Sequence, residues 1–138
     1  MTLIATLLLA GVIGNGAHDA VALLNHTDWT DIGPGRGYSQ LKPAEVAQLR
    51  KCATTSMYFE RWDGRSFDQV FVTGIGMRNS FTRVDLAQSA DTKVITLYRD
   101  AKSAKPGETL WLTNNGTVLT QLIPPASPHV FVRCDHRQ

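Results

Sequence analysis

The sequence predicts a mainly β domain, an antiparallel meander that closes into a small six- to eight-stranded barrel or sandwich with one short N-terminal helix. Three observations favour this fold class. Short runs rich in aromatic and β-branched residues recur after residue 56, an Asp-Gly pair separates two of them, and a single earlier segment has helical spacing. A chain of 138 residues, 43% hydrophobic and 19% charged, has the size and composition of one globular domain.

The N-terminal segment has the pattern of a secretory leader. Residues 3–13 form an apolar run with no charged residue, and several small residues follow it. The run is too short for a membrane-spanning helix, which needs roughly 20 residues. We therefore expect residues 1–22 to be a signal peptide or N-terminal apolar segment and residues 23–138 to be a single β-rich domain. The expected location is periplasmic or secreted, with no integral membrane segment after processing.

Two points about this leader stay open. Met1 and Thr2 bring no positive charge, which a leader usually carries at its start, so the alternative is an ordinary buried segment of the fold. The cleavage point also has two candidates. Cleavage before Ala17 follows small residues close to the apolar run, whereas cleavage after Ala22 matches the small-x-small pattern better but lies further from the run.

The two cysteines, Cys52 and Cys134, allow only one intramolecular pairing. Export would place them where a disulfide persists, so we predict a Cys52–Cys134 bond; the alternative is two unpaired buried thiols. The bond would enclose nearly the whole β-region. The chain-entropy argument gives roughly 4–5 kcal/mol for so long a loop, before native-state strain reduces it.

The segment before Cys52 contains the predicted helix. Residues 17–40 are poorly patterned and rich in Gly and Pro, and we expect Trp29 and Tyr38 to anchor them to the domain. A short helix then begins near Pro43, because proline suits a first helical turn and Glu45 complements the positive end of the helix dipole. We expect this helix to cover one opening of the barrel.

The first hairpin is predicted around Asp63-Gly64, a strong two-residue turn signal between the runs 57–62 and 66–72. In that register Glu60 lies opposite Phe67 and Tyr58 opposite Gln69. One face then carries large aromatic side chains with polar groups between them, namely Tyr58, Trp62, Phe67 and Phe71 with Glu60, Arg65 and Gln69. The other face, with Met57, Phe59, Val70 and Val72, fits packing better.

Further strands are predicted at 81–86, 93–98, 109–112, 117–122 and 129–134, which makes about seven in all. Gly74-Ile75-Gly76 is expected to mark a bulge or corner. A second hairpin is predicted at Asn114-Asn115-Gly116, with a loop of two or three residues. Residues 101–107 read as a polar loop.

These elements together suggest a family. An early cysteine, the hairpin Phe59–Phe67, the run Thr-Leu-Trp-Leu-x-x-x-Gly-Thr-x-Leu-Thr at 109–120 and the closing Phe-Val-Arg-Cys at 131–134 cover roughly residues 50–135. In these features the chain resembles small exported lipocalin-like (calycin-like) β-barrel proteins of bacteria. The resemblance implies a barrel fold, and it assigns no functional residue.

The chemistry of the sequence narrows the function classes. A net charge of +2, with basic residues spread along the chain, gives no stripe for nucleic acid. The four histidines have no spacing typical of metal ligands, and we predict no metal site and no cofactor. A serine-hydrolase elbow and a three-glycine phosphate loop are absent. The acidic residues, Glu108 among them, are expected mostly at turns or on solvent faces. We therefore predict that the protein is not an enzyme.

The function expected from these observations is an exported non-catalytic envelope binding module that holds a small apolar ligand. The predicted site is the aromatic hairpin face, with Tyr58, Trp62, Arg65, Phe67 and Phe71 as its residues. The alternative is a protein–protein inhibitor of a cell-wall-degrading or other envelope enzyme, presenting a loop such as Gly74–Ser80 or Ala101–Gly107. A cavity lined by apolar side chains would favour the ligand, and a filled barrel with a protruding polar loop would favour the inhibitor.

Overall fold

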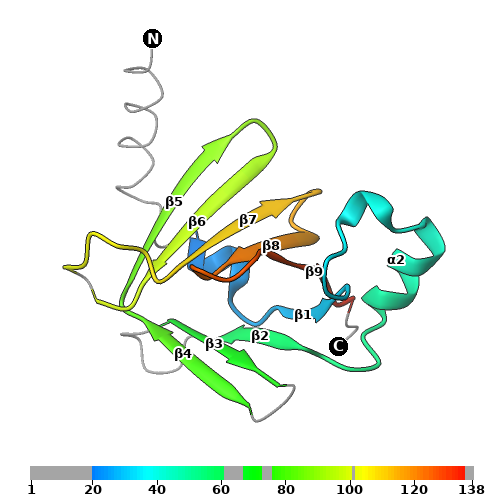
Figure 1. Ribbon diagram of the computed structural model, residues 1–138, viewed down its shortest axis with the longest axis horizontal. Coiled ribbons are helices and arrows are strands. Elements are labelled where there is room, and N and C mark those ends of the chain that lie inside the picture. Colours follow the sequence, from blue (N-terminus) through cyan, green and yellow to red (C-terminus); the bar gives the residue numbers. More distant parts are fainter. Residues whose placement is uncertain (1–19, 61–66, 73–75, 101, 136–138) are drawn as a thin grey trace.

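The computed structural model describes residues 20–60, 67–72, 76–100 and 102–135 (Figure 1). Within these ranges the chain forms nine strands, a 3-10 turn η1 (Tyr38–Gln40) and the helix α2 (Pro43–Arg50). The strands are β1 (Asp28–Asp31), β2 (Met57–Glu60), β3 (Phe67–Phe71), β4 (Met77–Phe81), β5 (Arg83–Ser89), β6 (Thr92–Tyr98), β7 (Glu108–Thr113), β8 (Val118–Leu122) and β9 (His129–Arg133). The mainly β prediction is confirmed, with more strands than the predicted six to eight.

The strands build one antiparallel sheet in the order β4-β3-β2-β1-β9-β8-β7-β6-β5. Its two edge strands, β4 and β5, are separated in sequence only by Thr82, so the sheet bends back on itself into a nearly closed barrel. Phe81 and Val84 both face the interior, which means that the inward–outward alternation changes at this corner. A barrel of this kind removes most of the exposed sheet edge.

The two strands that the sequence patterns did not predict are β1 and β4. β1 has the sequence Asp-Trp-Thr-Asp, and its central Trp29 is fully buried although acidic residues flank it. β4 contains Arg78, Asn79 and Ser80, so it lacks the apolar alternation of a typical strand. Both are strands because neighbouring strands pair with them on one or both sides, which is a tertiary effect.

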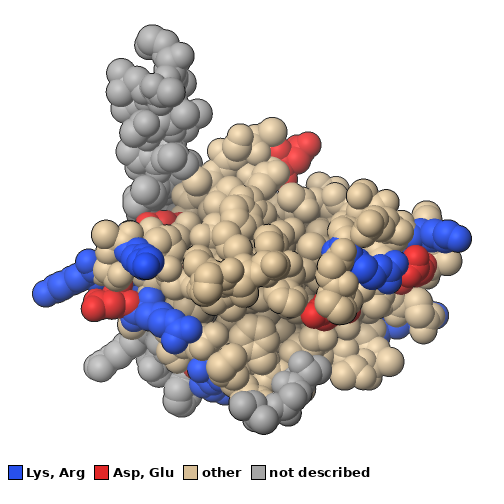
Figure 2. Space-filling model, viewed as in Figure 1, with Lys and Arg blue, Asp and Glu red and all other residues tan. Residues whose placement is uncertain are grey.

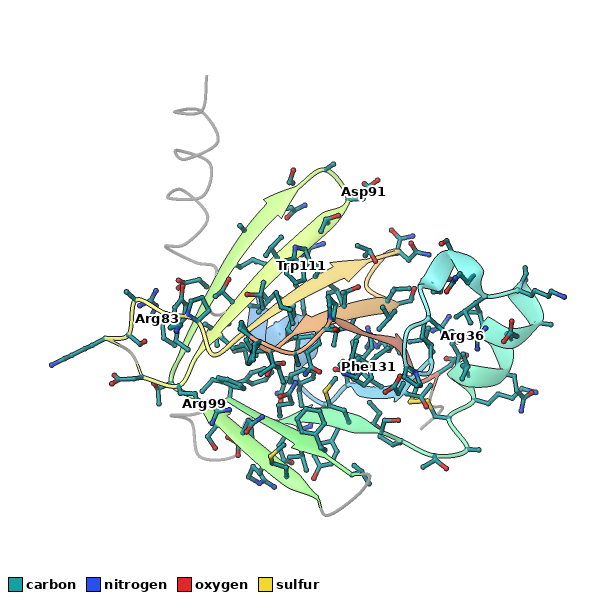
Figure 3. The ribbon with its side chains drawn as sticks, in the orientation of Figure 1. Arg36, Arg83, Asp91, Arg99, Trp111 and Phe131 are labelled. Carbon is teal, nitrogen blue, oxygen red and sulfur yellow. A yellow bond between two sulfur atoms is a disulfide. The ribbon has the colours of Figure 1, made fainter. Side chains whose placement is uncertain are left out.

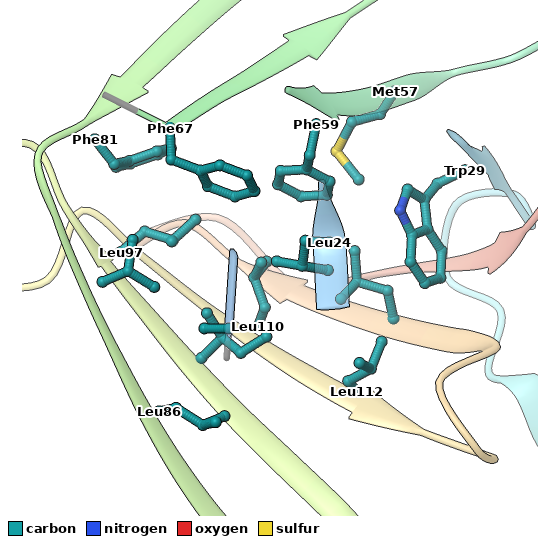
Figure 4. Packing of buried hydrophobic residues seen from close by; sticks show 14 of the residues in the cluster. Leu24, Trp29, Met57, Phe59, Phe67, Phe81, Leu86, Leu97, Leu110 and Leu112 are labelled. Carbon is teal, nitrogen blue, oxygen red and sulfur yellow. The ribbon is translucent and has the colours of Figure 1, made fainter. Parts of the chain in front are cut away.

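The interior is filled by apolar side chains from all parts of the sheet (Figure 4). The labelled members of this core are Leu24, Trp29, Met57, Phe59, Phe67, Phe81, Leu86, Leu97, Leu110 and Leu112. Trp29 is fully buried, as its predicted anchoring role requires.

A helical stretch at residues 20–24 enters this interior, and Leu24 lies among core side chains in Figure 4. Ala20 and Leu24 are both 0% exposed. The hydroxyl of Thr27 donates to the Leu24 carbonyl oxygen at 2.5 Å, and the indole N–H of Trp29 donates to the Thr27 hydroxyl oxygen at 2.7 Å. The first of these bonds gives a partner to a carbonyl oxygen at the C-terminal end of the helical stretch, which lies inside the domain.

The predicted helix is confirmed as α2, with Pro43 at its start and the Glu45 carboxylate accepting from the Lys42 backbone N–H. None of its residues is buried. The burial pattern therefore gives no support to a helix that closes a barrel opening; residues 20–24 reach the interior instead. In Figure 1 α2 lies beside the end of β9.

The predicted Cys52–Cys134 disulfide is confirmed, with Cα atoms 5.4 Å apart and 82 residues of separation. It joins the residue that follows the α2 region to the end of β9. A backbone bond from the Asp135 N–H to the Arg50 carbonyl oxygen, 2.6 Å long, supports the same junction. The α2 region is therefore connected to the barrel mainly at one corner.

The predicted register of the first hairpin is wrong by one residue. Phe59 lies opposite Gln69 and Glu60 opposite Asp68. Directly opposed residues share a face, so the observed register brings Met57, Phe59, Phe67 and Phe71 to the interior together. The predicted register would have divided these four between two faces. The Asp63-Gly64 turn itself lies outside the described residues.

The second hairpin also has a longer loop than predicted. Thr113 pairs with Val118, which leaves the four residues 114–117 as the turn. Asn114, Asn115 and Gly116 all have positive φ, at 51°, 55° and 80°. Asn and Gly tolerate this backbone region best, which explains why the turn forms here.

Candidate functional site

The structure separates the residues of the predicted aromatic site. Tyr58 lies on the outer face of β2, whereas Phe67 and Phe71 point to the inner face of β3. Phe67 is buried and stacks on Phe59, with ring centroids 5.5 Å apart, so it serves packing. Trp62 and Arg65 lie outside the described residues. Ligand binding by this hairpin stays a prediction, but its described residues do not share one face.

A cluster of polar side chains lies inside the barrel instead. Gln69 from β3 and Gln121 from β8 both donate through Nε2 to Oε1 of Glu108 on β7, at 2.5 and 2.7 Å. Both amides also reach the Met57 sulfur, at 3.2 and 3.7 Å. We call Glu108, Gln69, Gln121 and Asn79 the interior polar cluster; each is 5% exposed or less.

Burial sets the acid–base behaviour of Glu108. Removal from water raises its pKa to about 7, and hydrogen bonds from Gln121 and Gln69 and the charge of Arg99 oppose the rise only in part. A carboxyl group with such a pKa gains and loses its proton near neutrality, where ordinary carboxyl groups stay ionised. The cluster therefore holds a buried proton-binding group at the start of β7.

The sequence contains one signal for this cluster, which is the position of its polar residues within runs of alternating apolar residues. Glu108 is two residues before Leu110, which in turn is two residues before Leu112, and all three are buried. Gln121 has the same spacing from Leu119, and Gln69 stands between Phe67 and Phe71. A polar residue in register with an apolar alternation marks a polar group on the inward face. The prediction that acidic residues lie mostly at turns or solvent faces is wrong for Glu108 and for Asp68, which are both buried.

Basic residues gather at the connection between β6 and β7 (Figures 2 and 3). We call residues 99–107, without the undescribed residue 101, together with Arg83, the basic loop surface; it includes Arg99, Lys102 and Lys105. Lys102 and Lys105 are exposed. In Figure 3 Arg83 and Arg99 lie at the base of this loop, which projects from the barrel.

The loop is held by its own hydrogen bonds. The Lys102 backbone N–H donates to an Asp100 carboxylate oxygen at 3.0 Å, and the Ser103 backbone N–H donates to the Asp100 carbonyl oxygen at 3.1 Å. The Ser103 hydroxyl accepts from the Lys105 N–H at 3.2 Å and donates to its carbonyl oxygen at 3.0 Å. These bonds hold the backbone next to both lysines.

Two arginines support the loop from the barrel. The Arg83 guanidinium lies over the Tyr98 ring at 3.8 Å, contacts the Asp85 carboxylate at 3.0 Å and donates to the Ser103 carbonyl oxygen at 3.4 Å. The Arg99 guanidinium lies 6.0 Å from the Phe81 ring centre and donates to Asn79 Oδ1 at 3.3 Å. Arg99 thus connects the basic loop surface with the interior polar cluster.

The surface has several grooves with volumes in the range of small-molecule sites, and two of them differ clearly in their lining. One, of about 470 Å³, lies between η1 and α2 and is lined mainly by apolar side chains; its lining includes Tyr38, Leu41, Pro43 and Val46. The other, of about 340 Å³, lies at one end of the barrel beside the Asn114–Gly116 turn. Its lining is mainly polar, with Asp91, Lys93 and Arg133.

On the outer face of the first hairpin, Arg78 holds two acids together. Glu60 and Asp68 lie directly opposite each other, and the Arg78 guanidinium contacts both carboxylates, at 2.9 and 2.6 Å. Opposed like charges are unfavourable on a sheet, and the shared arginine compensates them. The two acids are therefore neighbours because β2 and β3 pair in this register.

In the part of the chain that the structure describes, no group of three or more His, Cys, Asp or Glu side chains is placed to hold a metal ion. The same residues contain no helix long and apolar enough to cross a membrane. No family model matches the sequence, and no curated protein or solved structure matches it either.

Proposed function

We propose that this chain is an exported, non-catalytic protein-binding module whose contact surface is the basic loop surface. The observation that carries the proposal is the filled interior. Leu24, 0% exposed, occupies the middle of the barrel, where a barrel of the ligand-carrying kind would hold its ligand. A filled barrel with a projecting polar loop is the arrangement that favours a protein partner over an enclosed apolar molecule.

The partner that fits this surface is a protein with an acidic cleft. Four positively charged side chains lie on or at the base of this loop, and two acids, Asp85 and Asp100, lie close to them. The positive charges belong to Arg83, Arg99, Lys102 and Lys105. Enzymes that cleave the glycosidic bonds of cell walls place paired carboxylates in such clefts. Inhibition of a wall-degrading envelope enzyme is therefore the activity we propose, with charge complementarity guiding the encounter.

The test measures inhibition and binding with a panel of purified cell-wall glycosidases acting on peptidoglycan. The variant Lys102→Ser/Lys105→Ser removes two charges from the loop, and we expect it to weaken binding by roughly tenfold or more. Lys42→Ser/Lys51→Ser is the matched control, because it removes the same charge beside α2. Equal loss in both variants, or no inhibition of any enzyme in the panel, contradicts the proposal.

A second function is favoured by one observation. The apolar groove between η1 and α2, about 470 Å³, lies within the range of small-molecule sites. An apolar ligand of the envelope would then bind outside the barrel. Native mass spectrometry of protein purified from its own envelope tests this, with Val46→Asp as the variant that should lose the bound mass. A ligand that survives Val46→Asp places it elsewhere.

Export is part of the proposal. The disulfide is compatible with export. The resemblance of the sequence to exported lipocalin-like barrels agrees with the same location. Ala20 is fully buried in the core, so cleavage before Ala17 keeps this residue, whereas cleavage after Ala22 removes it. We expect the exported protein to begin at Ala17. The intact mass of protein recovered from the envelope distinguishes the two ends, and a start at Leu23 contradicts this expectation.

A further inference from the structure

A chain of hydrogen bonds connects the buried Glu108 with the base of the basic loop surface. Gln69 donates to Glu108 at 2.5 Å, Asn79 Nδ2 donates to Gln69 Oε1 at 3.4 Å, and Arg99 donates to Asn79 Oδ1 at 3.3 Å. The four groups come from β7, β3, β4 and the residue after β6. The interior acid and the exposed loop are therefore in physical contact through two neutral amides.

Glu108 also adjoins the loop along the chain. It follows Gly107 directly, and the Gly107 N–H donates to the Leu97 carbonyl oxygen at 2.9 Å. Gly107 is packed closely against Arg99: a Cβ there would lie 3.3 Å from Arg99 Cγ. A movement of the Arg99 side chain therefore changes the packing at the end of the loop.

Among the described residues, the charge that acts on Glu108 is positive and comes from Arg99. The side chains that contact it or its amide partners from β2, β3, β4 and β8 are neutral, namely Met57, Gln69, Asn79 and Gln121. Asp68 and Arg78 alternate with Gln69 and Asn79 and belong to the outer ion pair of that hairpin. Arg99 is the charged side chain among the described residues whose charge acts on Glu108.

We propose that Glu108 is a proton-operated switch that sets how Arg99 is held and so alters the basic loop surface. With a proton on Glu108, Arg99 keeps its hydrogen bond to Asn79, and the loop has the observed geometry. When the proton leaves to solvent, the buried negative charge attracts the Arg99 guanidinium and weakens its bond to Asn79. An effect on partner binding rests on the proposed function, whereas the switch itself is a property of the free protein.

The experiment is an NMR titration of the free full-length protein from about pH 5 to 8.5, with backbone and side-chain amides observed. The reporters are the Ser103 and Gly107 N–H groups in the loop and the Gln69, Gln121 and Asn79 side-chain amides inside. We expect both sets to shift with one common midpoint near neutrality. Loop signals that stay constant while the interior amides titrate refute the switch.

Two variants test whether the shared transition belongs to Glu108. Glu108→Gln removes the proton-binding group in nearly the same shape, and the shared transition should be lost from both sets of signals. Arg99→Gln changes an exposed side chain and keeps Glu108; the interior amides should still titrate, at higher pH, and the loop should no longer follow. A shared transition that persists in either variant overturns the proposal.

Asp85→Asn is the matched control, because it removes one carboxylate from the outer face, where Asp85 contacts Arg83. It should leave the common midpoint unchanged. If Asp85→Asn moves the midpoint as far as Arg99→Gln does, any nearby charge acts on the interior amides. That result also contradicts a switch formed by Glu108 and Arg99. None of these readouts uses a partner, so failure of the switch and failure of the proposed binding function are distinguishable.

Discussion

Two short α-helical segments in the described part of the chain, residues 20–24 and α2, differ in almost every respect. Residues 20–24 have no clear helical signal, yet Ala20 and Leu24 are fully buried in the core. α2 has proline at its start and an acid in its first turn, yet it buries none of its residues. The comparison shows that a strong local signal decides where a helix forms and says little about how much it contributes to the core.

The physical cause is the source of each segment's stability. α2 is supported by local terms, the Glu45 contact with the Lys42 N–H and the Arg36–Glu45 ion pair at 3.0 Å. Exposed ion pairs of this kind contribute little to stability, because water screens them. Residues 20–24 depend on burial, which contributes more for each side chain. The barrel interior and the α2 region should therefore respond very differently to substitution.

The largest difference is expected within β2 itself. Phe59 is fully buried and stacks on Phe67, whereas its neighbour Tyr58 is half-exposed on the outer face. We expect Phe59→Ala to lower the free energy of unfolding by about 3–5 kcal/mol and Tyr58→Ala to lower it by roughly 1 kcal/mol or less. Denaturant unfolding measures both. If Tyr58→Ala is the more damaging, the inner and outer faces are assigned the wrong way round.

The two helical segments can be compared by matched truncations. Leu24→Ala removes a fully buried side chain, and the expected loss is about 2–5 kcal/mol. Val46→Ala in α2 removes a half-exposed one, and the expected loss is roughly 1 kcal/mol or less. Thermal unfolding of both variants tests the contrast. Similar losses in the two would mean that α2 is part of the core.

Removal of the disulfide tests how the α2 region is held. Cys52→Ser/Cys134→Ser should lower the free energy of unfolding by about 2–4 kcal/mol, because the bond closes a loop of 82 residues. Hydrogen exchange should increase in α2 more than in β7 and β8, since the bond connects α2 to the end of β9. Equal increases throughout the chain would contradict a separate α2 region.

The pH dependence of stability tests the barrel interior alone, because α2 contains no counterpart of the buried Glu108. The pKa of Glu108 is about 7 in the fold, above its ordinary value of 4.5, so the folded state binds the proton more tightly than the unfolded state. This contribution is fully present below about pH 4.5 and is lost as the pH rises through about 7, by up to about 3 kcal/mol. Unfolding of Glu108→Gln should lack this slope, and a slope equal to that of the parent protein assigns the proton to another group.

Much of the fold can be read from short-range patterns. The α2 start at Pro43, the strands around Val84, Ile95 and Leu110, and the single cysteine pairing all follow from local chemistry or from elimination. Strand β1 cannot be predicted from such patterns, because Trp29 is its only large apolar residue. The first hairpin register cannot be predicted from them either, since it depends on which choice buries the most aromatic surface at once.

The sequence by itself determined a mainly β domain, its main helix and the residues that can form its disulfide, because spacing and turn chemistry act over a few residues. Only the tertiary structure decided that Leu24 enters the barrel and that Glu108, Gln69 and Gln121 meet there. These residues are 13 to 97 positions apart. The contacts arise when the sheet bends and closes, and the same closure excludes the water that would otherwise keep Glu108 ionised.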